Sequence, residues 1–181
     1  RLQSLLDTFE TRQAGDASFL ERVHDLIEDE SGALYNELFD GTSLEVGKRL
    51  SKEEREVNNL NEAKSLIYGE VDYHSFYRLL RKINPAPGGI FYDLGSGTAK
   101  AVLAARFTRD FDKCVGIEIL GGLHGQGEKV LKRFNSDFVK YLASGQSNDT
   151  FLFHGSFLDY DWTNGDVVFA NSTCFDDDLM S

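Results

Sequence analysis

The amino-acid sequence predicts an α/β fold in which helices wind around a parallel sheet and a helical extension precedes it. Two observations support this prediction. From residue 89 to residue 171, short apolar runs bounded by turn residues alternate with amphipathic segments, and such alternation favours a parallel sheet. Residues 1–67 carry apolar side chains at helical spacing. We therefore expect a helical N-terminal region over residues 1–67 and a separate core over residues 68–181.

Length, charge and hydropathy restrict the class of protein. The 181 residues suffice for one domain with an appendage, and their formal net charge is −11. Such a surface repels phosphate backbones and attracts basic proteins, although the charge can also serve solubility alone. No apolar run approaches the ~20 residues of a membrane span. We expect an intracellular protein that binds no membrane and no specific nucleic-acid sequence. Because the chain begins with Arg1, we also expect it to be a piece of a longer one.

Cysteine and histidine usage excludes several kinds of site. Cys114 and Cys174 are the two cysteines, and they form no CxxC pair. This excludes a disulfide framework and a Cys-rich zinc site, and it fits a reducing compartment. His74, His124 and His154 show no metal-ligand spacing. No metal site is expected.

Helices are predicted for the first part of the chain. LQSLLDTF at residues 2–9 and SFLERVHDLIED at residues 18–29 have apolar residues three and four positions apart. Ser-Lys-Glu-Glu at residues 51–54 resembles a capping box, which opens a helix running to about Leu66. After a break, residues 74–83 form another short amphipathic helix.

The segment NPAPGG at residues 84–89 holds both prolines and separates the helices from the sheet. Beyond it, a helix is expected over residues 98–108 and a long one over residues 127–142. The long helix places Val130, Phe134, Phe138 and Tyr141 or Leu142 on one face. Compact apolar runs predict four buried strands, at residues 89–94, 114–120, 151–157 and 166–171.

The stretch FYDLGSGTAKAV places glycines directly after the first strand. Ligands of open parallel sheets bind at the carboxyl ends of the strands. Gly95 and Gly97 would let the backbone approach such a ligand, and the next helix would offer unpaired amides. The alternative is a tight strand-to-helix turn without a ligand.

The neighbouring residues indicate which ligand the turn would take. Glu118 ends the second strand, where a carboxylate can accept hydrogen bonds from both hydroxyls of a ribose. A GxGxxG fingerprint would need glycine or alanine at Lys100, and no GK[ST] of a Walker loop follows. Asp93, directly before the turn, suits an ammonium group better than a pyrophosphate. S-adenosylmethionine is such a ligand, because it is a nucleoside that carries an ammonium group. GGLHGQGE, at residues 121–128, is then expected to be a mobile loop near the ribose.

In this order, DLGSG, GIE, GSFL and VVFAN resemble the core of a class I S-adenosylmethionine-dependent methyltransferase. YGEV, GSFLDYDW and ANSTCFDDDLM narrow the resemblance to the Dot (disruptor of telomeric silencing) family of non-SET histone-lysine methyltransferases. The resemblance covers about residues 60–181. It implies a Rossmann-like parallel sheet for the cofactor-binding methyltransferase core. We expect that sheet to be truncated after about four strands, with the others supplied by the rest of the chain or by a partner.

The resemblance also implies roles for individual residues. Tyr68, Gly69 and Glu70 would close over the methionine end of the cofactor, which Asp93 and the turn from Gly95 to Gly97 face, while Glu118 binds the ribose. Ser156 and Phe157 would meet the adenine. Asn171 would also contact the cofactor, and catalytic roles fall to Asn171 and Tyr68. Phe169 and Phe175 would line a substrate channel; the alternative is that both are core residues, which Phe169 within the apolar run VVFA favours.

The chain departs from the family pattern at several positions. Ser156 stands where the family has Asp, and Ala99 and Lys100 replace Gly-Gln. Lys100 is therefore either a cation near the mouth of the site or a solvated lysine in the first helical turn. Ser172 and Thr173 stand where the family has Asn and Phe. These departures concern the acceptor more than the cofactor.

The resulting hypothesis is a methyltransferase that uses S-adenosyl-L-methionine to modify a lysine of a histone, a nucleosome or another basic protein. The location would be nuclear if the acceptor is a histone and cytoplasmic otherwise. One alternative is a class I methyltransferase with a small-molecule or non-histone acceptor. Another is a catalytically silent scaffold that binds the cofactor. The N-terminal helices are expected to form the wall and lid of the site.

Overall fold

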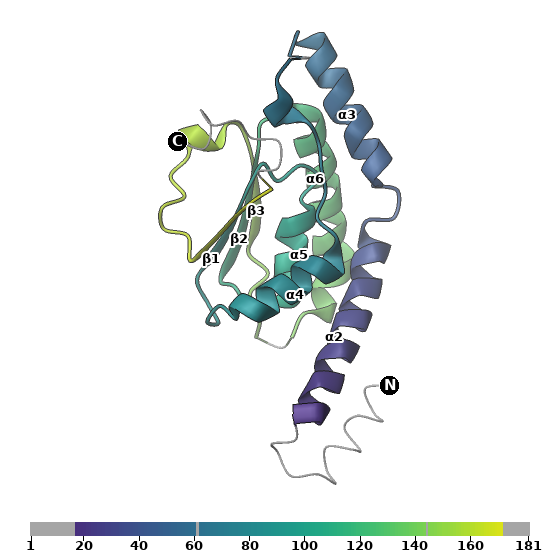
Figure 1. The fold of residues 1–181 in the computed structure, drawn as a ribbon, viewed down its shortest axis with the longest axis vertical. Helices are drawn as coiled ribbons and strands as arrows, with labels where there is room; N and C mark the ends of the chain where they lie inside the picture. Colours follow the sequence, from purple (N-terminus) through teal and green to yellow (C-terminus); the bar gives the residue numbers. More distant parts are fainter. Residues whose placement is uncertain (1–16, 61, 144, 172–181) are drawn as a thin grey trace.

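The sheet is parallel and follows the predicted order of elements. The computed structural model describes residues 17–60, 62–143 and 145–171. Within them, the four strands pair in the order β3-β2-β1-β4, all parallel (Figure 1). This is the strand order of a Rossmann-type sheet around its switch point. The α/β prediction is therefore confirmed. The strands are β1 (Ile90–Leu94), β2 (Lys113–Glu118), β3 (Thr150–His154) and β4 (Val167–Ala170).

One face of the sheet is covered by helices and carries the main core. Figure 1 shows α4, α5 and α6 on this side. Phe76, Phe91 and Leu103 are buried there. The helices are α4 (Tyr73–Ile83), α5 (Lys100–Thr108) and α6 (Gly121–Arg133), the last continued by a π-helical turn (η2, Phe134–Phe138) and a 3-10 turn (η3, Val139–Tyr141).

The opposite face of the sheet has a smaller apolar cluster. Tyr92 and Val115 are buried on it, and Phe157, Tyr160 and Trp162 pack against it from the segment that follows β3. This segment begins with a 3-10 turn, η4 (Phe157–Asp159). Alternate strand residues thus serve opposite faces, which is why the strands read as nearly continuous apolar runs.

The N-terminal helices belong to the same packed body as the sheet. Helix α2 (Ala17–Leu38) contributes Tyr35 and Leu38 to the main core cluster. A buried carboxylate adds a polar link to α4, because Glu28 lies 2.9 Å from His74 Nδ1 and 3.0 Å from Arg78 Nε. The boundary at residue 67 stays a prediction. The predicted helix over residues 2–9 lies outside the described residues.

The capping box predicted at residues 51–54 is wrong. Helix α3 (Leu44–Val57) begins earlier, where Ser43 caps it by accepting from the Val46 amide. Ser51 is buried inside the helix, and its hydroxyl donates to the carbonyl of Leu66 at 2.9 Å. The helix also ends well before Leu66, which belongs instead to a 3-10 turn, η1 (Lys64–Leu66). The pattern failed because the serine has a tertiary partner that local spacing does not reveal.

The mobile loop predicted at residues 121–128 is also wrong, because these residues form the first turns of α6. Glu54 of α3 accepts hydrogen bonds from the amides of Gly121 (2.8 Å) and Gly122 (2.7 Å). This carboxylate satisfies two of the four free amides at the helix start and opposes its positive dipole end. At Gly127 a side chain would come within 3.3 Å of the Thr98 backbone, so the glycine permits close packing.

The predicted face of the long helix is confirmed at its main positions. Val130, Phe134 and Phe138 are buried. Tyr141 and Leu142 were the alternatives for the last position of this face. Leu142 packs against the core, whereas Tyr141 is 52% exposed. None of the helices within the described residues has both the length and the apolarity needed to cross a bilayer.

Glu54→Ala is expected to lower the free energy of unfolding by about 1–2 kcal/mol, because α6 loses a side-chain cap that serves two amides. Chemical denaturation followed by circular dichroism measures the loss. Glu53→Ala is the matched control. Glu53 precedes it in the same helix, and its one interaction within the described residues is an exposed pair with Arg49 at 3.9 Å, so its effect should stay below about 0.5 kcal/mol. Equal losses in the two variants would contradict the capping role.

Candidate functional site

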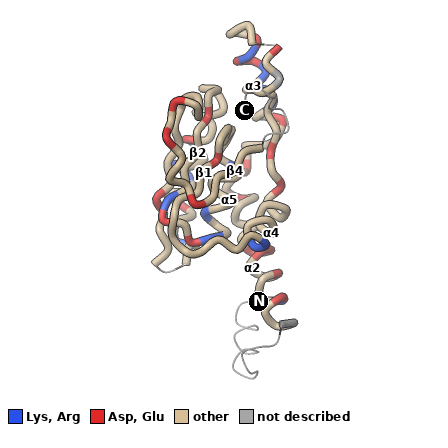
Figure 2. Tube along the Cα trace, turned by 60° about the vertical axis from the view of Figure 1, so that its left-hand side comes forward, with Lys and Arg blue, Asp and Glu red and all other residues tan. Residues whose placement is uncertain are grey.

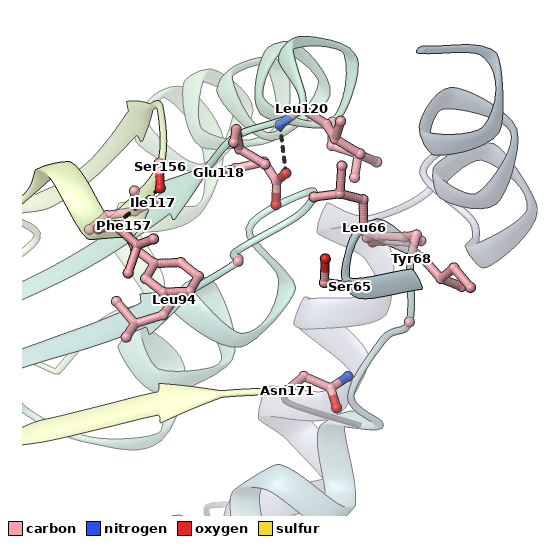
Figure 3. A pocket seen from close by; sticks show the side chains of 16 residues that line it. Ser65, Leu66, Tyr68, Leu94, Ile117, Glu118, Leu120, Ser156, Phe157 and Asn171 are labelled. Carbon is pink, nitrogen blue, oxygen red and sulfur yellow. Dashed lines mark hydrogen bonds between the residues drawn. The ribbon is translucent and has the colours of Figure 1, made fainter. Parts of the chain in front are cut away.

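A cavity of about 280 Å³ lies at the carboxyl ends of β1 and β2, where the glycine turn was predicted to bind a ligand (Figure 3). The cavity is enclosed by the ends of these two strands, the chain before α4, the turn after β3, the start of α6 and the residue that follows β4. The close-up shows Glu118, Phe157 and Asn171 around this space from different elements. The lining residues are Ser65–Gly69, Leu94, Gly95, Ile117–Leu120, Leu123, Ser156–Leu158 and Asn171.

The amides of the glycine turn are used inside the protein. Gly95 and Ser96 both donate to the carbonyl of Ile117, at 2.9 and 3.0 Å. Gly97 donates to Glu118 Oε2 at 2.7 Å, and Ala99 donates to the carbonyl of Ser96. These four amides are therefore not available to a ligand, whereas the unpaired amides were expected at the start of the next helix. Hydrogen bonds to the end of β2 occupy amides that a phosphate-binding loop would leave free for its ligand.

Glu118 is the best-anchored polar side chain of the cavity. It is 6% exposed, and its second oxygen accepts from the Leu120 amide at 2.8 Å. Burial raises the pKa of Glu118, and the amides of Leu120 and Gly97 act in the opposite direction. The two amides fix the carboxylate in one orientation at the cavity wall. Each of its oxygens keeps a second lone pair that can accept a hydroxyl.

Asp93 borders a smaller cavity next to the first. This second space, about 20 Å³, shares Tyr68, Gly69, Gly95 and Asn171 with the larger one. It has room for a group of about the size of one water molecule. The two cavities thus form one site with a wide part and a narrow polar end.

The carboxylate of Asp93 has no donor in the part of the chain that the structure describes. Asp93 as a whole is only 3% exposed. Burial, and then the nearby charge of Glu118, raises the pKa of Asp93 to about 8. A buried carboxylate without a partner favours an incoming cation, because the cation would offset the cost of burying its charge. Asp93 therefore suits an ammonium group.

Tyr68 closes the site from the chain before α4. Its hydroxyl donates to Glu70 Oε1 at 2.7 Å. The Thr98 hydroxyl, 2.9 Å away, then donates to the phenol oxygen. Burial raises the pKa of Tyr68 well above its usual value, so the phenol stays neutral at physiological pH. Its ring is held between two glycines: a side chain at Gly47 would come within 2.1 Å of it, and one at Gly97 within 2.4 Å.

The role expected of Gly97 therefore changes. Gly97 lines neither of the two cavities. With φ at 55°, it leaves room for the Tyr68 ring and orients its own amide toward Glu118. Gly95, with φ at 84°, does line both spaces. Of the two glycines, only Gly95 is placed to let the backbone approach a ligand.

The remaining predicted residues lie at different parts of the site. Ser156 and Phe157 line the wide cavity, with Ser156 Oγ accepting from the Leu158 amide at 3.2 Å. Asn171 borders both cavities, with its side-chain nitrogen close to Gly69. Phe169 borders the narrow end but packs edge-on against Phe76 at 5.1 Å, so it is also a core residue.

Some predictions lie beyond the described residues, and some contacts were missed. Phe175, Ser172, Thr173 and Cys174 are outside the described part of the chain. Of the alternatives for Lys100, the solvated lysine is wrong, because its side chain is only 15% exposed and pairs with Glu70. The contact between Gly47 and Tyr68 was not foreseen. Residues distant in sequence make it, and no local pattern signals it.

The donor set fits a nucleoside that carries an ammonium group. The wide cavity combines apolar walls with the anchored Glu118, and the narrow end holds the unpartnered Asp93. Among the described residues, no group of three or more His, Cys, Asp or Glu side chains could hold a metal ion. The apolar walls and the two carboxylates suit an organic ligand of mixed polarity.

Comparisons with known proteins give one family match. The family model described as histone methylation protein DOT1 matches residues 48–181. No curated protein matches significantly. Among solved structures, one from Methanococcus maripaludis, assigned provisionally to the S-adenosyl-L-methionine-dependent methyltransferases, is 12% identical with a TM-score of 0.46. The alignment covers 71% of this chain and 53% of the other, so the chain spans about half of that protein.

Gly47→Ala is expected to destabilise the protein by about 1–3 kcal/mol and to weaken ligand binding, because the new methyl group displaces the Tyr68 ring. Helix propensity alone would give the opposite sign, a gain of up to about 1 kcal/mol. Gly125→Ala is the control for propensity, since α6 leaves nothing within 4 Å of its side-chain position. Thermal unfolding separates the two effects. Stabilisation by both substitutions would contradict the packing of Tyr68 described above.

Proposed function

Since this chain belongs to the DOT1 family of histone methylation proteins, we propose that it transfers a methyl group to the side-chain amine of a lysine in a histone or another basic protein. The class I methyltransferase fold and the cofactor, S-adenosylmethionine, follow from the family. One observation carries the proposal furthest. A buried carboxylate anchored by two amides and a buried carboxylate without a donor lie at the ends of adjacent strands, in the matched region.

Each part of the cofactor has a counterpart in the site. Glu118 would accept hydrogen bonds from the ribose hydroxyls, and Asp93 would bind the ammonium of the amino-acid end. Ser156 and Phe157 would contact the adenine, Phe157 through its ring face. The two cavities together provide the wide apolar part and the narrow charged end that such a molecule needs.

The residues of the chain mainly align the reactants and exclude water. The cofactor, when bound, supplies a methyl group on an already activated sulfonium. A neutral lysine amine can attack such a carbon without a strong base, so correct placement contributes most of the acceleration. The Asn171 amide can orient the amine through its carbonyl oxygen. Tyr68 keeps its proton and closes the site, because its hydroxyl is committed to Glu70.

The charge of the chain supports a basic acceptor. The net charge is −11, and Figure 2 shows acidic positions spread over the helical layer and the loops around the sheet. Such a surface attracts a lysine-rich protein and speeds its encounter. A nuclear location follows if the acceptor is a histone.

Glu118→Ala and Asn171→Ala are expected to separate binding from chemistry. Loss of Glu118 should raise the cofactor KM at least about tenfold, since its hydrogen bonds to the ribose are charge-assisted. Loss of Asn171 should act mainly on kcat, by up to about 100-fold, through misplacement of the amine.

Transfer of a labelled methyl group onto nucleosomes, free histones and lysate proteins measures both effects. Unchanged incorporation in the two variants would reject these roles. Label that reaches only small molecules would replace the lysine acceptor with a small one. Cofactor binding without any transfer would leave a scaffold.

Cofactor affinity is expected to rise with pH. Asp93, with a pKa of about 8, is mostly protonated at neutral pH in the free protein. An ammonium group stabilises the charged carboxylate and lowers this pKa, so binding releases a proton. Affinity for S-adenosylhomocysteine should therefore increase by up to about tenfold per unit from about pH 6 to 8 and then level off.

Calorimetry at pH 7 in buffers of different ionisation enthalpy counts the released proton. Asp93→Asn should bind more weakly and release correspondingly fewer protons. Binding to the unmodified protein without proton release would exclude Asp93 as the ammonium site.

A further inference from the structure

Strand β3 forms one edge of the sheet and lacks the features that usually protect an edge strand. In the order β3-β2-β1-β4, no strand of the described residues pairs with its outer side. Its sequence, TFLFH, contains no proline and no lysine, and its register with β2 runs without interruption. Native proteins blunt such edges with lysine, proline or a bulge, because an open edge pairs with other chains. The edge of β3 is therefore open to an additional strand.

The backbone of β3 directs hydrogen-bonding groups to this outer side. The carbonyl of Asp149 accepts from β2, and the amide of Gly155 donates to β2, so the odd-numbered residues face that strand. The N–H and C=O groups of successive residues in a strand point to opposite sides. The even-numbered residues therefore direct theirs away from β2; they are Thr150, Leu152 and His154.

Three aromatic side chains lie along the same edge, on the face of the sheet opposite the main core. Phe151 and Phe153 are 44% and 42% exposed, whereas Leu152 between them packs against the main core. Tyr160 lies beside Phe153, with ring centroids 5.4 Å apart, and its hydroxyl donates to the carbonyl of His154 at 3.2 Å. Exposed aromatic rings next to an open strand edge favour a partner with apolar side chains.

Charge distinguishes a segment of another protein from a second copy of this chain. Residues 113–118 and 149–163, which form this edge, contain four acids and one lysine: Glu118, Asp149, Asp159, Asp161 and Lys113. The three aspartates are exposed. A second copy would bring the same acids and a net charge of −11 to the contact, so the two edges would repel each other. A segment with basic side chains would be attracted instead.

We propose that the outer edge of β3 binds an extended segment of a partner protein as an additional strand, and that this segment alternates apolar residues with lysine or arginine. Main-chain hydrogen bonds to Thr150 and Leu152 would hold its backbone, and its apolar side chains would cover Phe151 and Phe153. Its basic side chains would meet the exposed aspartates of the edge. All residues of β3 are described and none lines either cavity, so this inference goes beyond the proposed function and does not depend on it.

Fluorescence anisotropy with a labelled peptide tests the proposal on the full chain. The probe alternates lysine and valine over about seven residues, which spans the five residues of β3 with one to spare at each end. A block peptide of the same composition, with all lysines together, keeps the charge and loses the alternation. The chain should bind the alternating peptide at least about tenfold more tightly, because only this peptide presents its valines on one face.

Substitutions in the chain locate the contact. Phe151→Thr and Phe153→Thr keep a strand-forming residue but remove the ring, and each should weaken binding by about five- to tenfold. Val168→Thr is the matched control, since Val168 is similarly exposed on β4 at the other edge of the sheet, and it should leave the affinity unchanged. Asp149→Asn should weaken binding by about two- to fivefold at low salt, whereas Asp29→Asn on α2 should not.

Methylation of peptide amides separates strand addition from attraction by charge alone. An added strand turns every second amide toward β3, so one of two peptides methylated at complementary sets of amides should lose binding and the other should keep it. Absence of binding, equal affinity for the alternating and block peptides, or full binding of both methylated peptides would overturn the proposal. Dimerisation of the free chain that Phe153→Thr abolishes would overturn it in favour of a second copy.

Discussion

The buried carboxylate of Glu118 is the interaction on which the rest of the site depends. One oxygen holds the amide of Gly97 after β1, and the other holds the amide of Leu120 before α6. The two amides offset part of the cost of burying the charge. They also tie the ends of the two central strands into one rigid corner. The shape of the cavity follows from this corner, because both of its strand-derived walls begin there.

Helix α3 lies outside the sheet and contacts the segments that surround the same corner. Glu54 caps α6, Ser51 holds the carbonyl of Leu66, and Gly47 leaves space for the Tyr68 ring. These contacts lie about one or two helical turns apart on one face of the helix. The hypothesis that the N-terminal helices form the wall of the site is therefore refined. The residues that line the cavity come from the chain after α3, and α3 fixes the positions of that chain and of α6.

At the narrow end of the site, a chain of hydrogen bonds joins several polar side chains but leaves Asp93 out. Thr98 and Tyr68 lead to Glu70, which holds Lys100, so this acid is neutralised within the protein. Asp93 stands apart from that chain, and burial, followed by the nearby charge of Glu118, raises its pKa. Glu70 is thus paired with a cation and Asp93 is not. This end of the site therefore favours a ligand that carries a positive charge. The acidic surface of the whole chain acts at longer range and concerns the acceptor.

By itself the sequence determined the sheet, its strands, the glycine turn and the carboxylates at its edge, since apolar runs and turn residues act over a few neighbouring positions. Asp93, Gly95 and Glu118 were found in this way. Only the tertiary structure decided how the polar groups pair. Ser51 looked like a cap and bonds a distant carbonyl, and residues 121–128 looked like a loop and form a helix capped by Glu54. Gly97 leaves space for the Tyr68 ring, and the nearly buried Lys100 pairs with Glu70. Hydrogen bonds and ion pairs join residues tens of positions apart, and no local spacing records which partner folding brings within reach.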